Sequence, residues 1–294
     1  MTLPEGFQIN QGNLQDYLDC QRRFQLRYLL QVSWPSLVSQ PASESENFLQ
    51  LGTTFHYLVR QHLSGVPLEL LTASVHETQP EEGSELITWW ENYITALQNT
   101  KDLGFLQNTI SPQETYRFPE VTLTTPLAGY RAVAKYDLVI LAPTGKAIIL
   151  DWKTNRKRPR RRWLQERIQS RIYPYILIKA GREINRGIPI QPECVEMRYW
   201  YANFPDQPEH ILYSTEQYLA DEVYLDDLVC QIVHKGDAEF PLTHNIDRCI
   251  YCVYRSLCDR GTHAGFFETS ESQTLDEVNE TMISDFQHID EIEF

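Results

Sequence analysis

A β-hairpin is predicted by YDLVILAPTGKAIILDWK, the stretch from Tyr136 to Lys153. Two runs rich in Val, Ile and Leu lie on either side of the turn sequence Ala142-Pro143-Thr144-Gly145. Pro143 suits the first corner of a type I turn, and Gly145 suits a following left-handed position. The sequence therefore predicts a three-residue loop closed by a Gly bulge.

The register of this hairpin places two carboxylates on one face of the sheet. A three-residue loop pairs Ala142 with Lys146 and, counting outward, sets Asp137 opposite Asp151, whereas a two-residue loop would send Asp151 to the other face. Lys153 lies two residues past Asp151 and therefore on the same face. Facing carboxylates repel each other, and a hard cation such as Mg²⁺ relieves that repulsion. For a D-x-K tripeptide alone, a surface salt-bridge cluster is the alternative.

Length and composition are those of a folded globular protein. The chain has 294 residues, of which 42% are hydrophobic and 12% aromatic, enough for a sizeable core in one or two domains. No apolar run approaches the roughly 18 residues of a membrane span. The N-terminal segment has neither a basic leader nor a hydrophobic core, so we expect a cytoplasmic protein.

Charge is distributed unevenly along the chain. The net charge of −14 argues against a nucleic-acid partner, because phosphate binding needs Lys and Arg. From Lys153 to Arg171, however, nine basic side chains are opposed only by Glu166. We therefore expect DNA phosphates to bind a basic patch that begins at the carboxylate pair. This patch holds Arg156, Lys157, Arg158, Arg160, Arg161 and Arg162.

The C-terminal end is acidic, and from Glu268 onward it contains no Lys or Arg. Such a segment predicts disorder, either as a solvated end or as a competitor with DNA for the basic patch. The expected organisation is one domain over residues 1–265 followed by an acidic tail over 266–294.

Hydrophobic periodicity predicts the other elements of an α/β fold. Helices are expected over residues 13–29, 48–63, 86–103, 161–180 and 215–235, with Asn13 as the first N-cap and either a kink or a new helix start at Pro174. Strands are expected over 114–123, 129–141 and, as the last strand, 193–202.

Four cysteines form a candidate metal site. Cys249, Cys252 and Cys258 have the spacing C-x2-C-x5-C, and Cys20 near the other end of the chain is a candidate fourth ligand. A cytosolic protein is not expected to form disulfides, so a metal is the better interpretation. The spacing leaves open whether four thiolates hold Zn²⁺ or an iron–sulfur cluster.

These motifs together resemble the RecB-like branch of the PD-(D/E)XK nuclease superfamily, which includes AddB-type and CRISPR-associated nucleases with a C-terminal iron–sulfur cluster. The resemblance extends from about Leu14 to Cys258. It rests on LQDYLDCQRRFQLRYLL (14–30), GTTFH (52–56), AKYDLVI (134–140), LDWKTN (150–155), QSRIY (169–173) and the arrangement of one early and three late cysteines.

The resemblance implies a restriction-endonuclease-like core: a central mixed sheet flanked by helices, with a [4Fe-4S] cluster joining the two ends of the chain through Cys20, Cys249, Cys252 and Cys258. It also implies Mg²⁺ or Mn²⁺ held by His56, Asp137, Asp151 and the backbone carbonyl of Trp152. Glu114 matches a further acidic position only loosely.

The activity implied is metal-dependent hydrolysis of DNA, as an exonuclease acting on single strands or ends in repair, recombination or CRISPR adaptation. Lys153 would orient the attacking water, and Gln169 and Tyr173 would position the strand. Protein partners in repair or CRISPR adaptation are a further expectation. Two alternatives remain open: a non-catalytic DNA-binding module, and a zinc-stapled interaction protein.

Overall fold

The computed structural model describes residues 3–33, 40–78, 84–98, 103, 106, 115–236 and 240–262, with side chains of the second range from residue 47 onward. The chain divides into two compact units. The first unit comprises Met1–Leu49, Pro126–Ala132 and Val223–Phe294, and the second comprises Gln50–Thr125 and Val133–Glu222. The predicted acidic tail and Glu114 lie outside the described residues.

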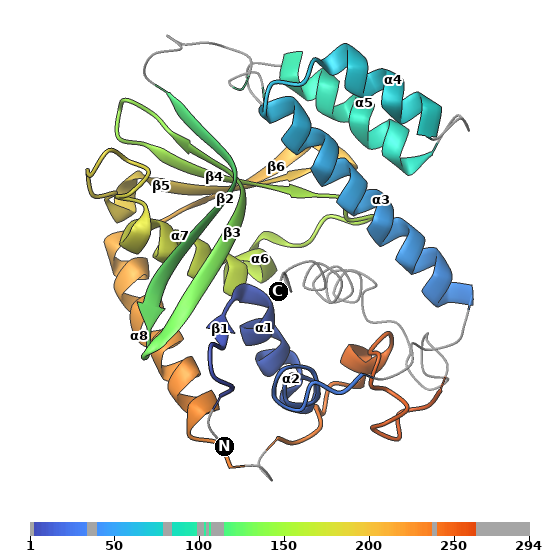
Figure 1. Cartoon of the computed structure of the whole chain (residues 1–294), viewed down its shortest axis with the longest axis vertical. Helices are drawn as coiled ribbons and strands as arrows, with labels where there is room; N and C mark the ends of the chain where they lie inside the picture. Colours follow the sequence, from blue (N-terminus) through green and yellow to red (C-terminus); the bar gives the residue numbers. More distant parts are fainter. Residues whose placement is uncertain are drawn as a thin grey trace. The chain divides into compact units, whose positions relative to one another are not determined.

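The strands form a six-stranded mixed sheet of order β1-β3-β4-β5-β6, and β2 also pairs with β3 (Figure 1). Strands β4 and β5 are parallel, whereas β3–β4 and β5–β6 are antiparallel, which confirms the predicted α/β fold with a mixed sheet. The strands are β1 (Gln8–Ile9), β2 (Tyr116–Leu127), β3 (Tyr130–Leu141), β4 (Ala147–Lys153), β5 (Val195–Tyr201) and β6 (Phe204–Leu212).

The β3–β4 hairpin has the predicted loop and register. Ala142 N donates to Lys146 O at 2.8 Å, and Gly145 adopts the left-handed φ of +85° that the bulge requires. The ladder pairs Leu138 with Leu150, so the next residues outward are Asp137 and Asp151. The turn chemistry therefore placed both carboxylates on one face, as the sequence indicated.

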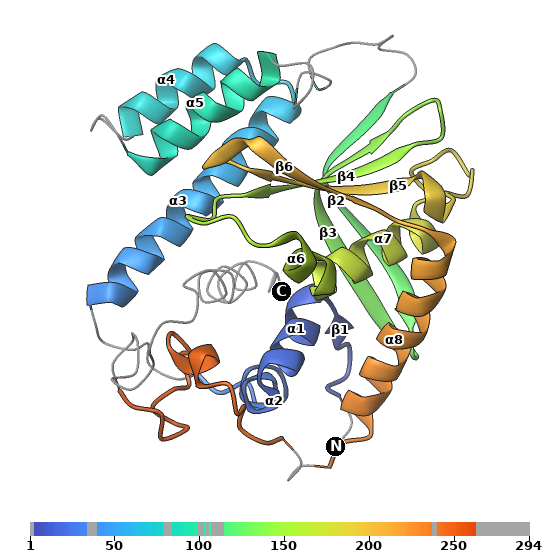
Figure 2. The ribbon, with the colours of Figure 1, turned by 180° about the vertical axis from the view of Figure 1, so that it is seen from behind.

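Helices flank the sheet, and in the second unit α4 and α5 lie side by side with α3 running next to them (Figures 1 and 2). The helix α7 packs against the sheet, where Tyr136 Oη donates to the backbone oxygen of Tyr173 at 2.9 Å. The α-helices are α1 (Gln11–Asp19), α2 (Gln21–Phe24), α3 (Gln40–Leu63), α4 (Leu68–Thr78), α5 (Glu85–Gln98), α6 (Arg161–Glu166), α7 (Ile168–Ala180) and α8 (Thr215–Val233).

Two predicted helices are each broken into shorter ones. The N-terminal helix is interrupted at Cys20, whose φ of −160° is extended, and a π-helical turn, Gln25–Leu29, follows α2. Its N-cap is Asn10, which forms a capping box with Asn13, so the prediction of Asn13 as the cap was wrong. The later helix breaks at Arg167, so it does not begin anew at Pro174, which lies inside α7.

Three elements, β1, β6 and α4, were missed by sequence periodicity. Strand β6 follows the strand expected to be last, and its sequence FPDQPEHIL contains two prolines, which are tolerated because β6 is an edge strand. Helix α4 lies between two predicted helices. No helix in the described ranges is both long and apolar enough to cross a membrane.

Aromatic side chains fill the core of the second unit. Phe55 of α3 stacks on Trp200 of β5 at 6.3 Å between ring centroids, and Tyr93 of α5 meets Trp152 of β4 edge-on at 5.7 Å. Such rings bury large apolar areas in fixed geometries. They therefore hold α3 and α5 against the strands that carry the candidate site.

The buried carboxylate of Glu196 on β5 contributes to stability at neutral pH, and this contribution is lost in acid. Burial by itself would raise its pKa, but hydrogen bonds from Arg198, Lys146 and His210 lower the pKa to about 2. A depressed carboxyl pKa contributes stability that is present above the unfolded pKa of about 4.3 and is lost as pH falls toward 2.

We therefore expect Glu196→Gln to have a lower free energy of unfolding than the wild type at pH 7. The difference in free energy between the two proteins should become smaller as the pH falls from 4.5 to 2.5. Urea unfolding at several pH values measures this difference. A difference that stayed constant with pH would contradict the ion-pair explanation.

Candidate active site

Asp137 and Asp151 face the same site from neighbouring strands of the second unit. Asp137 Oδ1 lies 3.2 Å from His56 Nδ1 of α3, and Asp137 Oδ2 accepts a hydrogen bond from Trp152 N at 2.9 Å. Asp151 is 5% exposed. The structure therefore brings His56, Asp137 and Asp151 into one cluster, although 81 residues separate the histidine from its carboxylate partner.

Lys153 and Gln169 complete this cluster. Lys153 Nζ lies 3.0 Å from Asp151 Oδ2 and donates to Gln169 Oε1 at 3.1 Å. Gln169 Nε2 in turn donates to Asp151 Oδ1 at 2.6 Å. The three side chains form a closed triangle of polar contacts between the end of β4 and the first turn of α7, which fixes the lysine ammonium beside a carboxylate.

The two carboxyl groups have opposite pKa shifts. Burial alone would raise the pKa of Asp137, but the charge and hydrogen bond of His56 and the Trp152 N–H lower it below its usual value. Burial raises the pKa of Asp151, and the charge of Asp137 adds to this effect while Lys153 opposes it. For His56, the carboxylate of Asp137 outweighs burial, so its pKa is raised. Divergent shifts of neighbouring groups are typical of functional sites.

Helix α3 reaches the site through a close approach at Gly52. A Cβ atom built on Gly52 would lie 3.0 Å from Thr154 Oγ1, which follows the lysine of the D-x-K motif. Gly52 and His56 are four residues apart and share one helix face. The glycine therefore lets α3 come close enough for His56 to contact Asp137.

We expect Gly52→Val to destabilise the protein by about 1–3 kcal/mol through overpacking and to reduce activity by moving His56. Gly52→Ala should have a smaller effect, because its gain in helix propensity of about 1 kcal/mol offsets part of the clash. Urea unfolding measures both. The matched test combines Gly52→Ala with Thr154→Ala, which removes the opposing hydroxyl. The double variant should be more stable than Gly52→Ala alone. Equal stability would contradict the predicted clash between residue 52 and Thr154.

Tyr173 is placed as a core residue. It is 5% exposed, its ring lies 4.9 Å from that of Tyr136, and its backbone oxygen accepts the Tyr136 hydroxyl. Its role in positioning a DNA strand stays a prediction.

The predicted basic patch has acidic partners. Arg156 pairs with Glu85 at 3.0 Å, and Arg162 pairs with Glu166 at 2.9 Å. Arg158 and Arg161 both pair with Glu209, which is 7% exposed on β6. These two arginines also donate to the backbone oxygens of Gln207 and His210, so they fasten the loop after β4 to the edge strand.

Burial of the acidic partner separates these basic side chains into two groups, because Glu166 is exposed and Glu209 is buried. Arg162 has 90% of its side chain exposed, and an exposed ion pair contributes only about 0–1 kcal/mol, so a phosphate can replace Glu166 at little cost. Lys157 and Arg160 are also exposed. Phosphate contacts by Arg158 and Arg161 would instead require Glu209 to give up its partners. The readily available part of the patch is therefore smaller than the sequence suggested.

The cluster fits a divalent cation in its donor chemistry. Asp151 Oδ2 is buried and accepts no well-aligned hydrogen bond from any described residue, although it pairs with Lys153. Carboxylate oxygens are the ligands that Mg²⁺ prefers. In the part of the chain that the structure describes, however, no group of three or more His, Cys, Asp or Glu side chains is arranged to hold a metal ion. Binding would require His56 and Lys153 to exchange their present contacts with the carboxylates.

The four cysteines of the predicted metal site lie in the first unit. None of these four cysteines is part of a disulfide. Burial raises the pKa of Cys249, and the nearby Cys20 raises it further, while Arg260, Arg23 and Arg255 oppose the shift. Cys258 likewise has a raised pKa from burial and from Cys20. The fold therefore brings Cys20 near two late cysteines, and Cys258 packs against the cluster that contains Cys252.

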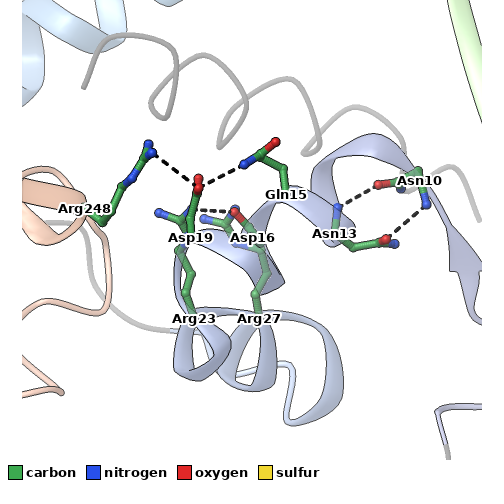
Figure 3. A network of polar contacts seen from close by, with 8 residues as sticks. All are labelled: Asn10, Asn13, Gln15, Asp16, Asp19, Arg23, Arg27 and Arg248. Atoms are coloured by element: carbon green, nitrogen blue, oxygen red, sulfur yellow. Dashed lines mark hydrogen bonds and ion pairs between the residues drawn. The ribbon is translucent and has the colours of Figure 1, made fainter. Parts of the chain in front are cut away.

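An ion-pair network beside these cysteines joins the early and late segments of the first unit (Figure 3). Asp19 Oδ1 accepts from Gln15 at 2.9 Å and lies 3.6 Å from Arg248. Asp19 and Arg248 each precede a cysteine of the predicted site. Arg23, which is 1% exposed, pairs with Asp16 at 2.8 Å, and Tyr254 Oη donates to Val32 O at 3.1 Å. These contacts join the early and late segments of the first unit.

This network was not predicted from the sequence. Neither were the ion pairs of Glu209 nor the hydrogen bond from Gln169 to Asp151. The acidic pair Asp16 and Asp19, at i and i+3 of a helix followed by Arg23 and Arg27, was a signal that could have been found. Glu209 gave no such signal, because its partners are about 50 residues away in sequence.

The chain is similar to one protein family and to several solved structures. No curated protein matches the chain. The solved structure of SSO0001 is similar, with 15% identity, a TM-score of 0.38 and coverage of 88% of each chain. The solved structure named "Putative exonuclease" from Eubacterium rectale has 13% identity and a TM-score of 0.46, covering 76% of this chain and 79% of that one. Residues 8–259 match the PD-(D/E)XK nuclease superfamily. Because this match covers most of the chain, including the hairpin with Asp137, Asp151 and Lys153, the chain belongs to the PD-(D/E)XK nuclease superfamily.

Proposed function

We propose that the chain is a Mg²⁺- or Mn²⁺-dependent DNA nuclease of the RecB-like branch, an exonuclease that hydrolyses phosphodiester bonds in single strands or at DNA ends. The observation that carries this proposal is the closed contact triangle of Asp151, Lys153 and Gln169 beside the Asp137–His56 pair. Superfamily membership supports hydrolysis of nucleic acid over other uses of such a cluster.

His56, Asp137, Asp151 and the backbone carbonyl of Trp152 would hold the cation. A bound divalent cation polarises the scissile phosphate and lowers the pKa of a coordinated water. The raised pKa of Asp151 reflects first its burial and then the nearby charge of Asp137, and a bound cation would offset both effects.

Lys153 would orient the attacking water and offset negative charge as it develops on the phosphate oxygens. Its ammonium donates to Gln169 as well as contacting Asp151, so the hydrogen bond to Gln169 can keep it in place when a cation takes the carboxylate. Gln169, which contacts both charged partners, would keep them apart from bulk water at the first turn of α7.

DNA phosphates would bind the exposed basic side chains after β4, chiefly Lys157, Arg160 and Arg162. Their contribution falls steeply with salt, because each neutralised phosphate releases counterions. Repair, recombination and CRISPR adaptation are the settings in which we expect the activity.

We also propose that Cys20, Cys249, Cys252 and Cys258 hold a [4Fe-4S] cluster, with Zn²⁺ as the alternative. The proximity of Cys20 to Cys249 and Cys258 and the surrounding arginines support a site for an anionic tetrathiolate centre. Iron, sulfide and zinc analysis of protein purified without oxygen separates the two, since a cluster also absorbs near ~400 nm and colours the protein brown.

Digestion of end-labelled DNA tests the nuclease. The substrates are single-stranded, duplex and circular single-stranded DNA, together with RNA of the same sequence, each with Mg²⁺, Mn²⁺ or EDTA. We expect linear DNA to be degraded from an end only when a cation is present. DNA binding without cleavage under either cation would favour a non-catalytic binding module instead, and cleavage of circles would identify an endonuclease.

A further inference from the structure

A series of hydrogen bonds holds the backbone from Lys153 to Asn155. The turn between β5 and β6 makes these contacts. Ala202 N donates to Lys153 O at 2.8 Å. The next residue, Asn203, donates through Nδ2 to Thr154 O at 3.1 Å and to Asn155 O at 2.9 Å. The segment that leaves β4 is therefore held at three successive carbonyl groups.

One face of α5 holds this turn in place. Trp89 Nε1 donates to Asn203 Oδ1 at 2.9 Å, and Asn92 Nδ2 donates to Ala202 O at 2.8 Å. Glu85 accepts from Arg156 on the same loop. Glu85, Trp89 and Asn92 stand at i, i+4 and i+7, so they share a single face of the helix. A helix far from the hairpin in sequence is thus tied to the loop that follows the D-x-K motif.

The chemistry of these partners fixes the orientation of the Asn203 amide. The indole N–H of Trp89 can only donate, and the carbonyls of Thr154 and Asn155 can only accept. A flipped amide would face its nitrogen toward the indole N–H and its oxygen toward the two carbonyls, which is unfavourable on every side. Trp89 is fully buried, so losing its acceptor would leave an unsatisfied donor. The amide of Asn203 can therefore make these three hydrogen bonds in only one orientation.

We propose that Asn203 is a positioning residue for Lys153, an inference that rests on the proposed nuclease function for its catalytic consequence. Asn203 touches neither carboxylate. It fixes the backbone immediately after Lys153, and thereby the origin of the side chain whose ammonium contacts Asp151 and Gln169. Helix α5 contacts Asn203 and so helps to hold the C-terminal end of β4, which carries Lys153.

The consequence for the reaction follows from distance. Displacement of a catalytic group by about 1 Å can reduce the rate about a hundredfold. Without the Asn203 amide, Thr154 and Asn155 lose their side-chain donor. The β4–β5 pairing, the Ala202–Lys153 hydrogen bond and the contacts of Arg156 and Arg158 remain, but the two residues after Lys153 are held less firmly. Lys153 would then sample positions away from Asp151. Substrate binding at the exposed basic side chains would change little.

Steady-state kinetics of Asn203→Ala test the proposal. We expect kcat to fall about tenfold or more with KM within about threefold of the wild type. Trp89→Phe keeps the ring in the core but removes the N–H, and should lower kcat in the same direction by a smaller factor. In the double variant the effects should be non-additive, because both changes break one contact chain. Additive effects on kcat would contradict the idea that Trp89 acts on Lys153 through Asn203.

The matched control is Asn185→Ala, which removes an amide that donates to Ile188 O at 2.9 Å in an exposed turn of the same unit. It should leave kcat unchanged. If Asn203→Ala lowered activity only in proportion to its unfolded fraction, measured by thermal unfolding, Asn203 would be a structural residue and the proposal would be wrong.

A second readout does not depend on nuclease activity. The rate of reductive methylation of Lys153, followed by peptide mass spectrometry, reports how firmly its ammonium is held. We expect faster methylation of Lys153 in Asn203→Ala than in the wild type, with Lys179 unchanged as an internal reference. An unchanged Lys153 rate would overturn the positioning role. If the wild type cleaves no DNA but the Lys153 rate still rises, the proposed function fails and the positioning of Lys153 stands.

Discussion

Asp151→Ala and Lys153→Ala are each expected to reduce DNA cleavage by at least about a hundredfold, because general acid–base and electrostatic contributions of single groups have this size. Asp151→Ala removes a proposed cation ligand and the partner of both Lys153 and Gln169. Lys153→Ala leaves the buried carboxylate of Asp151 without its ammonium partner. DNA binding should be mostly retained, since the exposed basic side chains are unchanged. End-labelled cleavage and filter binding measure the two properties.

Isosteric variants separate chemistry from folding in this experiment. Asp151→Asn keeps the shape and the acceptor for Gln169 but removes the charge, so it should be as inactive as Asp151→Ala while unfolding at a temperature close to that of the wild type. Asp206→Asn, the same change on an exposed residue of β6, is the matched control and should remain fully active. Undiminished cleavage by Asp151→Ala or Lys153→Ala would remove the assignment of this cluster as the active site.

Cys20→Ser is expected to abolish metal or cluster binding and to unfold much of the first unit. A structural zinc site contributes roughly 10–16 kcal/mol to folding of a small domain, which is comparable with the whole stability of a typical protein. The salt bridges near Cys20 remain in the variant, so partial structure around α1 and α2 can persist. Iron and zinc content, together with limited proteolysis, measure the outcome.

Cys230→Ser is the matched control for this second experiment. Cys230 also belongs to the first unit, in α8, but lies outside the C-x2-C-x5-C motif, so its replacement should leave metal content and protease resistance unchanged. If Cys20→Ser retained both properties, Cys20 would not be a ligand, and the three late cysteines would need another partner.

Much of the candidate site could be predicted from sequence because its geometry is local. The loop Pro143-Thr144-Gly145 sets the register of the β3–β4 hairpin, and register alone places Asp137 and Asp151 on one face. Lys153 follows by the alternation of side chains along a strand. His56 and Gln169 are known from sequence only by resemblance, since their positions depend on helices that pack onto the sheet.

Local rules failed where longer-range contacts outweighed helix propensity. The helix breaks lie at Cys20 and Arg167, and not at the proline that the sequence marked. Pro174 is accommodated inside α7 next to Tyr173, whose carbonyl is satisfied by Tyr136 of the sheet. Tertiary packing therefore decided where these helices end.

The sequence by itself determined the hairpin, its register and the identity of the charged groups at the site, because turn chemistry and strand alternation act over a few residues. Only the tertiary structure decided the partners of those groups. Glu209 engages two arginines that the sequence offered to DNA, and Asn203 grips the backbone beyond Lys153. Both come from the β5–β6 hairpin, about 50 residues later, and their contacts exist only because β5 pairs in parallel with β4.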